Sequence, residues 1–162
     1  MYKSIIYFAL VAILLLMEML AFAAKTLSGY ENLAWNTGFS RVYKKYPGGQ
    51  MTRFGDEGVY KQQKPTKSIA RRNFGFKNGK LHAVSITFEK GYIQAKGIGK
   101  VLSDQKSNFG EGVMDRSLAP HMIKYVWDGI DTKITFAYAP KRPDMTVIMF
   151  EEKGKISPVQ PR

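Results

Sequence analysis

The segment that most constrains this chain is 71–88, RRNFGFKNGKLHAVSITF, in which apolar residues alternate on both sides of an Asn-Gly pair at 78–79. Asn-Gly between alternating strands is a strong signal of a β-hairpin. A two-residue turn pairs Phe76 with Leu81, and a regular ladder then turns the phenylalanines of the first strand away from the apolar residues of the second. A three-residue turn with a glycine bulge pairs Phe76 with Lys80, and we predict this turn because it gives one apolar face. That face holds Phe74, Phe76, Val84, Ile86 and Phe88.

Two helices are predicted from apolar spacing. Apolar residues at i, i+3, i+4 and i+7 indicate an amphipathic helix from Phe39 to Tyr46, after a capping segment at 36–38 and before Pro-Gly-Gly at 47–49. A second helix is expected from about Tyr92 to Asn108, although its two early glycines each weaken it by ~1 kcal/mol.

The other periodic segments are short, and their apolar and polar residues alternate as in β-strands. They are 51–54, 59–62, 122–127, 132–138 and 145–151. The order helix, strands, helix, strands predicts an α+β two-layer domain, with two short helices packed on one face of an antiparallel meander sheet. We expect one such domain over 24–153 and a disordered tail at 154–162. The doubled order also suggests two similar halves, although no residue-by-residue repeat is found.

The N-terminus has the three parts of a secretory signal peptide. Lys3 gives a positive start, the run from Ile5 to Met17 is apolar, and the small residues of 20–23 suit cleavage before Ala24. The apolar run is shorter than the ~20 residues that a spanning helix needs. Residues 1–23 are therefore predicted to be a signal peptide that exports the protein to a periplasm or the cell exterior, with an uncleaved membrane anchor as the alternative.

The cysteine content and the net charge limit the possible functions. The chain has no cysteine, which excludes disulfides, thiolate metal sites and a cysteine nucleophile. Its 25 basic and 13 acidic residues give a net charge of +12, which favours association with polyanions. No cofactor motif is found: the two glycines at 97–99 lack the third glycine of a dinucleotide fingerprint. We expect no cofactor.

The segment 37–47, TGFSRVYKKYP, followed by a meander, resembles small bacterial envelope domains. The resemblance is to the outer-membrane-assembly lipoproteins of the SmpA/OmlA type and to β-lactamase-inhibitor-protein-like domains, in which a capped helix packs on an antiparallel sheet. It implies a non-enzymatic envelope interaction module. The lipoproteins carry an acylated cysteine that this chain lacks, so lipid anchoring does not carry over.

Basic residues concentrate around the first hairpin strand. These are Lys61, Lys64, Lys67, Arg71, Arg72, Lys77 and Lys80. Such a cluster is typical either of an ordinary solvated surface or of a site for an anionic partner. We expect it to bind an anionic envelope component or a protein partner, with peripheral membrane contact as one form. Nucleic acid is the lesser option because the chain has an export signal.

A catalytic alternative uses the few histidines. His121 follows Pro120 and lies downstream of Glu111 and Asp115, so the alternative function is a secreted cell-wall hydrolase that uses His121 with one of these carboxylates. His82 is expected on the same strand face as Val84, as a half-buried sheet residue. No metal-ligand spacing connects the two histidines. We therefore favour a non-catalytic function.

Overall fold

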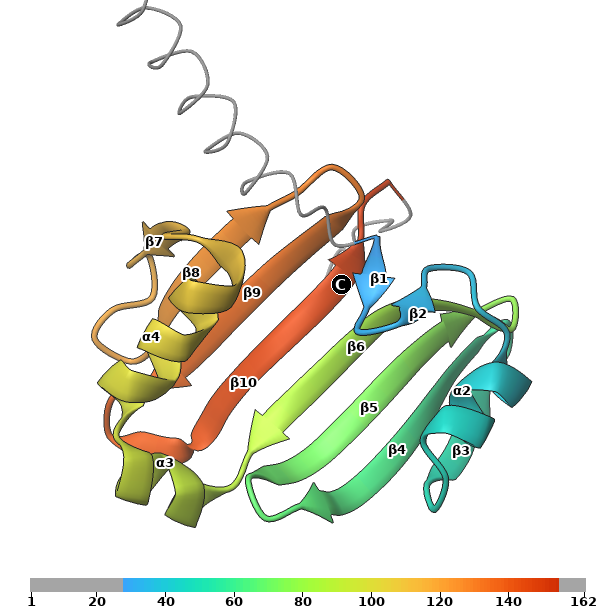
Figure 1. The fold of residues 1–162 in the computed structure, drawn as a ribbon, viewed down its shortest axis with the longest axis horizontal. Helices are drawn as coiled ribbons and strands as arrows, with labels where there is room; N and C mark the ends of the chain where they lie inside the picture. Colours follow the sequence, from blue (N-terminus) through green and yellow to red (C-terminus); the bar gives the residue numbers. More distant parts are fainter. Residues whose placement is uncertain (1–27, 155–162) are drawn as a thin grey trace, which may run out of the picture.

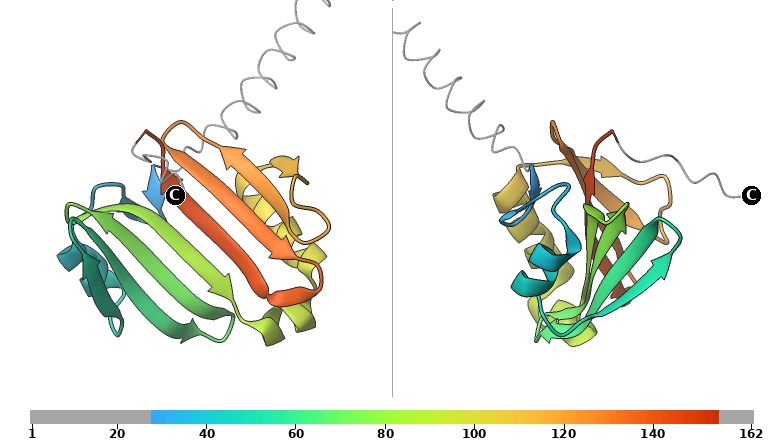
Figure 2. Two further views of the ribbon diagram at one scale, coloured as in Figure 1. Left: turned by 180° about the vertical axis from the view of Figure 1, so that it is seen from behind. Right: turned by 90° about the vertical axis from the view of Figure 1, so that its right-hand side faces the viewer.

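The computed structural model describes residues 28–154, and these form an eight-stranded antiparallel sheet with three helices and a small hairpin on one face (Figures 1 and 2). Among residues 28–154, no helix lies on the opposite face of the sheet (Figure 2). The elements are β1 (Gly29–Tyr30), β2 (Leu33–Ala34), α2 (Phe39–Lys45), β3 (Gln50–Phe54), β4 (Glu57–Thr66), β5 (Ile69–Lys77), β6 (Lys80–Phe88), α3 (Lys90–Lys96), α4 (Ile98–Phe109), β7 (Val113–Asp115), β8 (Ile123–Asp128), β9 (Thr132–Ala139) and β10 (Arg142–Glu152).

The sheet consists of two four-stranded meanders that meet at its centre. The strand order is β3-β4-β5-β6-β10-β9-β8-β7, so β6 of the first meander pairs with β10 of the second. Helix α2 precedes the first meander and α4 precedes the second. The predicted α+β class and the doubled element order are therefore present in the fold.

The central hairpin is as predicted, but its predicted turn is wrong. Lys77 pairs with Lys80 across a two-residue turn, in which both Asn78 and Gly79 have positive φ. The bulge lies inside β6 instead: Phe76 pairs with Leu81 and Gly75 with Ala83, which leaves His82 as the extra residue. This bulge still brings the predicted apolar face together, and it also turns Leu81 inward, where that side chain is fully buried.

The core lies between the helices and the sheet, along rows of side chains that cross the strands. One row runs through Tyr60, Phe74, Val84, Phe150, Ile134 and Trp127, all buried. Rings of α2 and α4 close it from above. Phe39 lies edge-on to Tyr60, and Phe109 lies edge-on to Trp127, with ring centres 5.4 and 5.7 Å apart. Each helix thus covers the outer strands of its own half.

The predicted first helix is confirmed as α2, whose N-terminal residue Gly38 makes no side-chain cap. The single helix expected from Tyr92 to Asn108 is wrong, because two helices meet at Gly97. That glycine has φ +81° and serves both as the end of α3 and as the start of α4. The fold therefore has three described helices where two were expected.

Strands are found at all five predicted segments, while β1, β2 and β7 were not predicted. The predicted signal peptide at 1–23 lies outside the described residues, as does the expected tail from 155 onward. Within residues 28–154, no helix has the length and apolar character needed to cross a bilayer.

Candidate ligand-binding site

The seven basic residues singled out in the sequence do not form one patch. Lys61 and Arg71 alternate with buried neighbours and so project from the uncovered face of the sheet. Lys64 lies near the end of β4, and Lys67 lies in the connection between β4 and β5.

At the opposite end of the hairpin, Lys77 and Lys80 pair across its turn, and Lys77 also pairs with Glu57. Arg72 is separated from all of these residues. It points to the helix-covered face and is only 8% exposed.

The guanidinium of Arg72 is held by two aromatic rings. It lies 4.7 Å from the ring centre of Tyr46, which ends α2, and 5.9 Å from that of Tyr30 in β1. Cation–π contacts of this kind are worth up to ~2 kcal/mol when desolvated. Arg72 thus connects the strand β5 to both elements that pack over it.

The carboxylate of Glu31, which contacts the same two tyrosines, is occupied by other groups. The hydroxyls of Tyr30 and Tyr46 both donate hydrogen bonds to it, the first at 3.0 Å, and Lys45 lies 3.9 Å away. Burial and the contact with Glu31 raise the pKa of Tyr46 well above its usual value, and burial is also the main cause of the raised pKa of Tyr30. Both phenols therefore stay protonated and neutral at ordinary pH.

The side chain of Arg72 makes no hydrogen bond or ion pair with any residue in the described part of the chain, and its buried Nε is unsatisfied. Its cross-strand neighbour Gln62 donates to the carbonyl of Pro47 at 2.7 Å, but the buried Oε1 of Gln62 is also unsatisfied. Burying a charge without a partner costs several kcal/mol. The buried Nε–H of Arg72 is therefore a hydrogen-bond donor that lacks an acceptor among the described residues.

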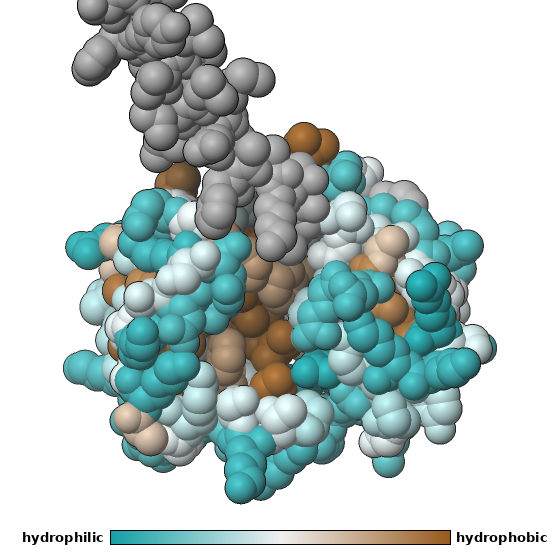
Figure 3. Space-filling view, viewed as in Figure 1, coloured by the Kyte–Doolittle hydropathy of each residue, from teal (hydrophilic) through white to brown (hydrophobic). Residues whose placement is uncertain are grey.

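A hollow lies beside Arg72 on the same face of the sheet. Figure 3 shows a hydrophobic floor between two hydrophilic lobes, and in the same view Figure 1 places β6 and β10 at the floor, α4 in one lobe and α2 in the other. Ile86 and Ile148 pair here across β6 and β10. Because Arg72 pairs with Ile86 on its other side, it lies between the floor and the α2 lobe. The hollow marks the junction of the two meanders.

Helix α3 and the end of β6 add further apolar groups near this floor. Phe88 pairs with Ile69 and stacks on Tyr92 of α3, with ring centres 6.1 Å apart. All three side chains are half-buried, unlike the sealed core beneath α2. The junction thus combines a buried arginine with accessible apolar surface.

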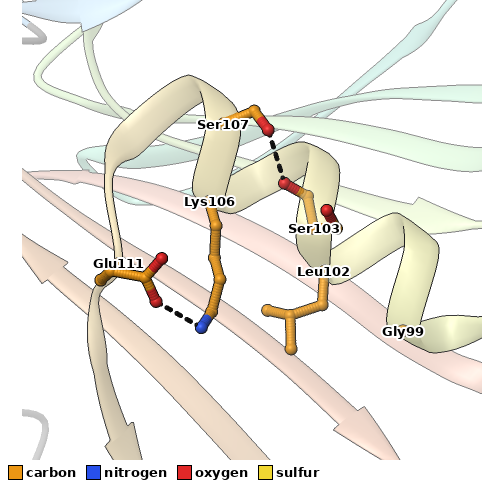
Figure 4. Close-up of a pocket in the computed structure, with 6 residues that line it drawn as sticks. All are labelled: Gly99, Leu102, Ser103, Lys106, Ser107 and Glu111. Carbon is orange, nitrogen blue, oxygen red and sulfur yellow. Dashed lines mark hydrogen bonds and ion pairs between the residues drawn. The ribbon is translucent and has the colours of Figure 1, made fainter.

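A second, shallow depression of about 400 Å³ lies on α4 (Figure 4). Its lining is Gly99, Leu102, Ser103, Lys106, Ser107 and Glu111. Lys106 and Glu111 form an ion pair at 2.6 Å, which raises the pKa of Lys106. Ser107 donates to the backbone carbonyl of Ser103 at 2.9 Å. Lys106, Glu111 and Ser107 are therefore each bonded to a neighbouring group, which leaves no base positioned on a serine of the depression.

The residues of the alternative hydrolase site, His121 with Glu111 or Asp115, do not contact one another through hydrogen bonds or ion pairs among the described residues. Glu111 is paired with Lys106, and Asp115 accepts a hydrogen bond from the Ser117 backbone at 2.8 Å, with Lys124 3.8 Å away. His121 is exposed and has no hydrogen bond or ion pair to either carboxylate among residues 28–154. No group of three metal-ligating side chains occurs within the described residues.

His82 differs from its expected position. As the bulge residue it does not share the face of Val84, because its ring lies beside Gly75 on the uncovered side of the sheet. The predicted face is wrong, and the in-strand bulge is the physical reason, but His82 is half-buried in the sheet as predicted.

No family model, curated protein or solved structure matches this chain. The resemblance to small envelope domains therefore stays a prediction.

Sequence reasoning grouped Arg72 with the neighbouring basic residues as a binding residue but did not predict its separate, buried position. A signal was present, since Arg72 has the same parity along the strand as Phe74 and Phe76, which predicts an inward side chain. The partners Tyr30, Glu31 and Tyr46 gave no signal, because all three are distant from Arg72 in the sequence.

Proposed function

We propose that this protein is a non-catalytic binding protein of the cell envelope that holds an amphipathic ligand with an anionic head group. The ligand lies in the hollow between α2 and α4, with its head group on Arg72. The observation that carries this proposal is the guanidinium of Arg72, which is nine-tenths buried and has no hydrogen-bonding partner among the described residues.

The anionic group is favoured by the electrostatics around Arg72. The rings of Tyr30 and Tyr46 stabilise its charge through their faces, while Glu31 is held by their hydroxyls. The guanidinium fork therefore keeps its N–H groups for a carboxylate or a phosphate, which it binds in a bidentate manner. In a site of low dielectric constant such a bond is stronger than at the surface.

The apolar part of the ligand is favoured by the floor of the hollow. Ile86 and Ile148 pair beneath it and are themselves buried, and the surface that Figure 3 shows there is hydrophobic. Burying apolar ligand surface contributes about 25 cal/mol per Å². A single charged group beside a hydrophobic cleft is the usual composition of a small-molecule site, in which the polar contact fixes orientation.

The envelope location is supported by the predicted signal peptide at 1–23, and the absence of cysteine fits an exported bacterial protein. The net charge of +12 also favours an anionic ligand, because it raises the local concentration of anions.

The test is a titration of the purified protein with hexadecanoate and with hexadecanol, by displacement of a fluorescent fatty acid. We expect hexadecanoate to bind about 10- to 100-fold more tightly, since a hydrogen bond to a charged group contributes ~1.5–3 kcal/mol. Arg72→Leu should abolish this preference. Arg71→Leu, on the opposite face, removes the same charge from the next residue and should preserve it.

Two outcomes would overturn the proposal. One is that neither compound displaces the probe from the wild-type protein. The other is that Arg72→Leu, shown to be folded by circular dichroism, keeps the full preference for the acid.

A further inference from the structure

The three described helices carry most of their charge with one sign. Together α2, α3 and α4 contain seven basic residues and one acidic residue, Asp104. The basic residues are Arg41, Lys44, Lys45, Lys90, Lys96, Lys100 and Lys106. Helix α2 contains no acidic residue, and the side chains of Arg41 and Lys44 make no ion pair or hydrogen bond within residues 28–154.

This charge lies on one side of the molecule. All three helices pack on the same face of the sheet (Figure 2), and the lobes of α2 and α4 flank the hydrophobic hollow (Figure 3). Four of the seven cations are ion-paired: Lys45 with Glu31, Lys96 and Lys100 with Asp104, and Lys106 with Glu111. Two of the other three, Arg41 and Lys44, lie in α2 beside the hollow.

The uncovered face of the sheet carries cations such as Lys61 and Arg71 on its first half, whereas charges of opposite sign pair across the strands of its second half. Lys133 pairs across strands with Glu151 and Asp128, and Lys124 lies 3.8 Å from Asp115. Cross-strand pairs of opposite charge neutralise one another locally. An anionic surface is therefore attracted less to this second half of the sheet than to α2, which has three basic residues and no acidic one.

Helix α2 also exposes an aromatic ring between its cations. Tyr43 is 49% exposed and is followed directly by Lys44 and Lys45. Tyrosine is enriched at membrane–water interfaces, where its ring contacts the acyl boundary and its hydroxyl contacts the head groups. Lysine and arginine near an anionic membrane surface add about 1 kcal/mol each.

We propose that the face formed by α2, α3 and α4 docks on the surface of an anionic lipid bilayer. The head groups bind the helix cations and Tyr43 enters the interface. This orientation places the opening of the hollow toward the lipid, so that an amphipathic ligand can pass between bilayer and Arg72. Only that passage rests on the function proposed above; docking itself depends on the helix charges alone.

The test is flotation of the full chain with vesicles of phosphatidylcholine, with or without about one-third phosphatidylglycerol. We expect binding only to the vesicles with phosphatidylglycerol, and we expect it to decrease with salt, because exposed charges are screened. The double variant Arg41→Glu/Lys44→Glu should lower the partition coefficient by at least about 10-fold. The matched control Lys61→Glu/Arg71→Glu makes the same charge change on the uncovered face and should lower it less than about threefold.

Equal loss in both double variants would overturn the proposal, since net charge and not the helix face would then control docking. Equal binding to both kinds of vesicle would also overturn it. Arg72→Leu separates the two proposals, because it should lose hexadecanoate selectivity while keeping vesicle docking. If the Arg41→Glu/Lys44→Glu variant docks normally while the wild type binds hexadecanoate selectively, the docking proposal fails and the ligand site stands.

Discussion

The guanidinium of Arg72 lies 4.7 Å from the ring centre of Tyr46, and this contact joins the centre of the sheet to the end of α2. The hydroxyl of Tyr46 meanwhile donates to Glu31. A tyrosine therefore separates a cation from an anion that would otherwise neutralise it. This separation leaves the charge of Arg72 available to a ligand, and it predicts that the residue contributes more to binding than to stability.

Replacing Arg72 by methionine should leave the free energy of unfolding unchanged or raise it by up to about 2 kcal/mol. Removal of a buried charge that has no counterion eliminates its desolvation cost, and this outweighs the lost cation–π contacts. Urea unfolding followed by tryptophan fluorescence measures the change. Arg71→Met is the exposed control, with an expected change within about 0.5 kcal/mol. A loss above about 2 kcal/mol on Arg72→Met would show that the arginine is a structural element.

The stability of the protein should fall as pH rises above about 10. Burial raises the pKa of both Tyr30 and Tyr46, so these phenols stay protonated in the folded state while those of the unfolded chain ionise near pH 10. The unfolded state then binds fewer protons, and each tyrosine lowers the free energy of unfolding by up to about 1.4 kcal/mol per pH unit. Below pH 10 the contribution is fully present.

Urea unfolding at pH values from 8 to about 11 measures this slope. The Tyr30→Phe/Tyr46→Phe variant should lose most of it, whereas Tyr43→Phe, whose ring is half-exposed, should keep it. An identical slope in the wild type and the double variant would contradict the assignment.

The hairpin illustrates how far hydrophobic alternation predicts a register. Two arrangements place Phe74 and Val84 on one face: a bulge in the turn, or a two-residue turn with a bulge in β6. Leu81 distinguishes them, because only the second arrangement turns it inward, where it is fully buried. The sequence thus predicted the shared face correctly, while the choice of turn required weighing one more apolar residue.

The candidate site shows a different limit. Arg72 alternates in register with Phe74 and Phe76 along β5, which indicated an inward side chain. An arginine is rarely buried without a counterion, however, so an exposed side chain was expected. Its environment depends on Tyr30 and Tyr46, which contact it only after the β1–β2 hairpin and α2 pack on the sheet. Such contacts between segments far apart in sequence leave no local periodicity. The break between α3 and α4 at Gly97 could have been predicted from the sequence, since a glycine inside a helical pattern marks a possible helix end.

Deletion of His82 should be tolerated. Because it is the extra residue of the bulge, its removal leaves every other β5–β6 pair intact and restores a regular ladder. We expect a loss of less than about 2 kcal/mol in the free energy of unfolding. Deletion of Ser85 shortens the same strand by one residue but shifts Ile86 and Phe88 to the uncovered face, so that variant should not fold. Circular dichroism and urea unfolding compare the two. Equal losses would show that His82 has a structural role beyond the bulge.

Two glycines of the α4 region should respond in opposite directions to alanine. At Gly112, where φ is +69°, a Cβ atom would lie 2.6 Å from Trp127, whose indole is fixed by a hydrogen bond to the Gly110 carbonyl. Gly112→Ala should therefore cost about 2–4 kcal/mol through overlap and backbone strain. At Gly99, in the first turn of α4, a Cβ atom meets nothing within 4 Å, so Gly99→Ala should raise stability by about 0.5–1 kcal/mol. Thermal unfolding measures both, and a stable Gly112→Ala variant would mean that the loop before β7 can move away from Trp127.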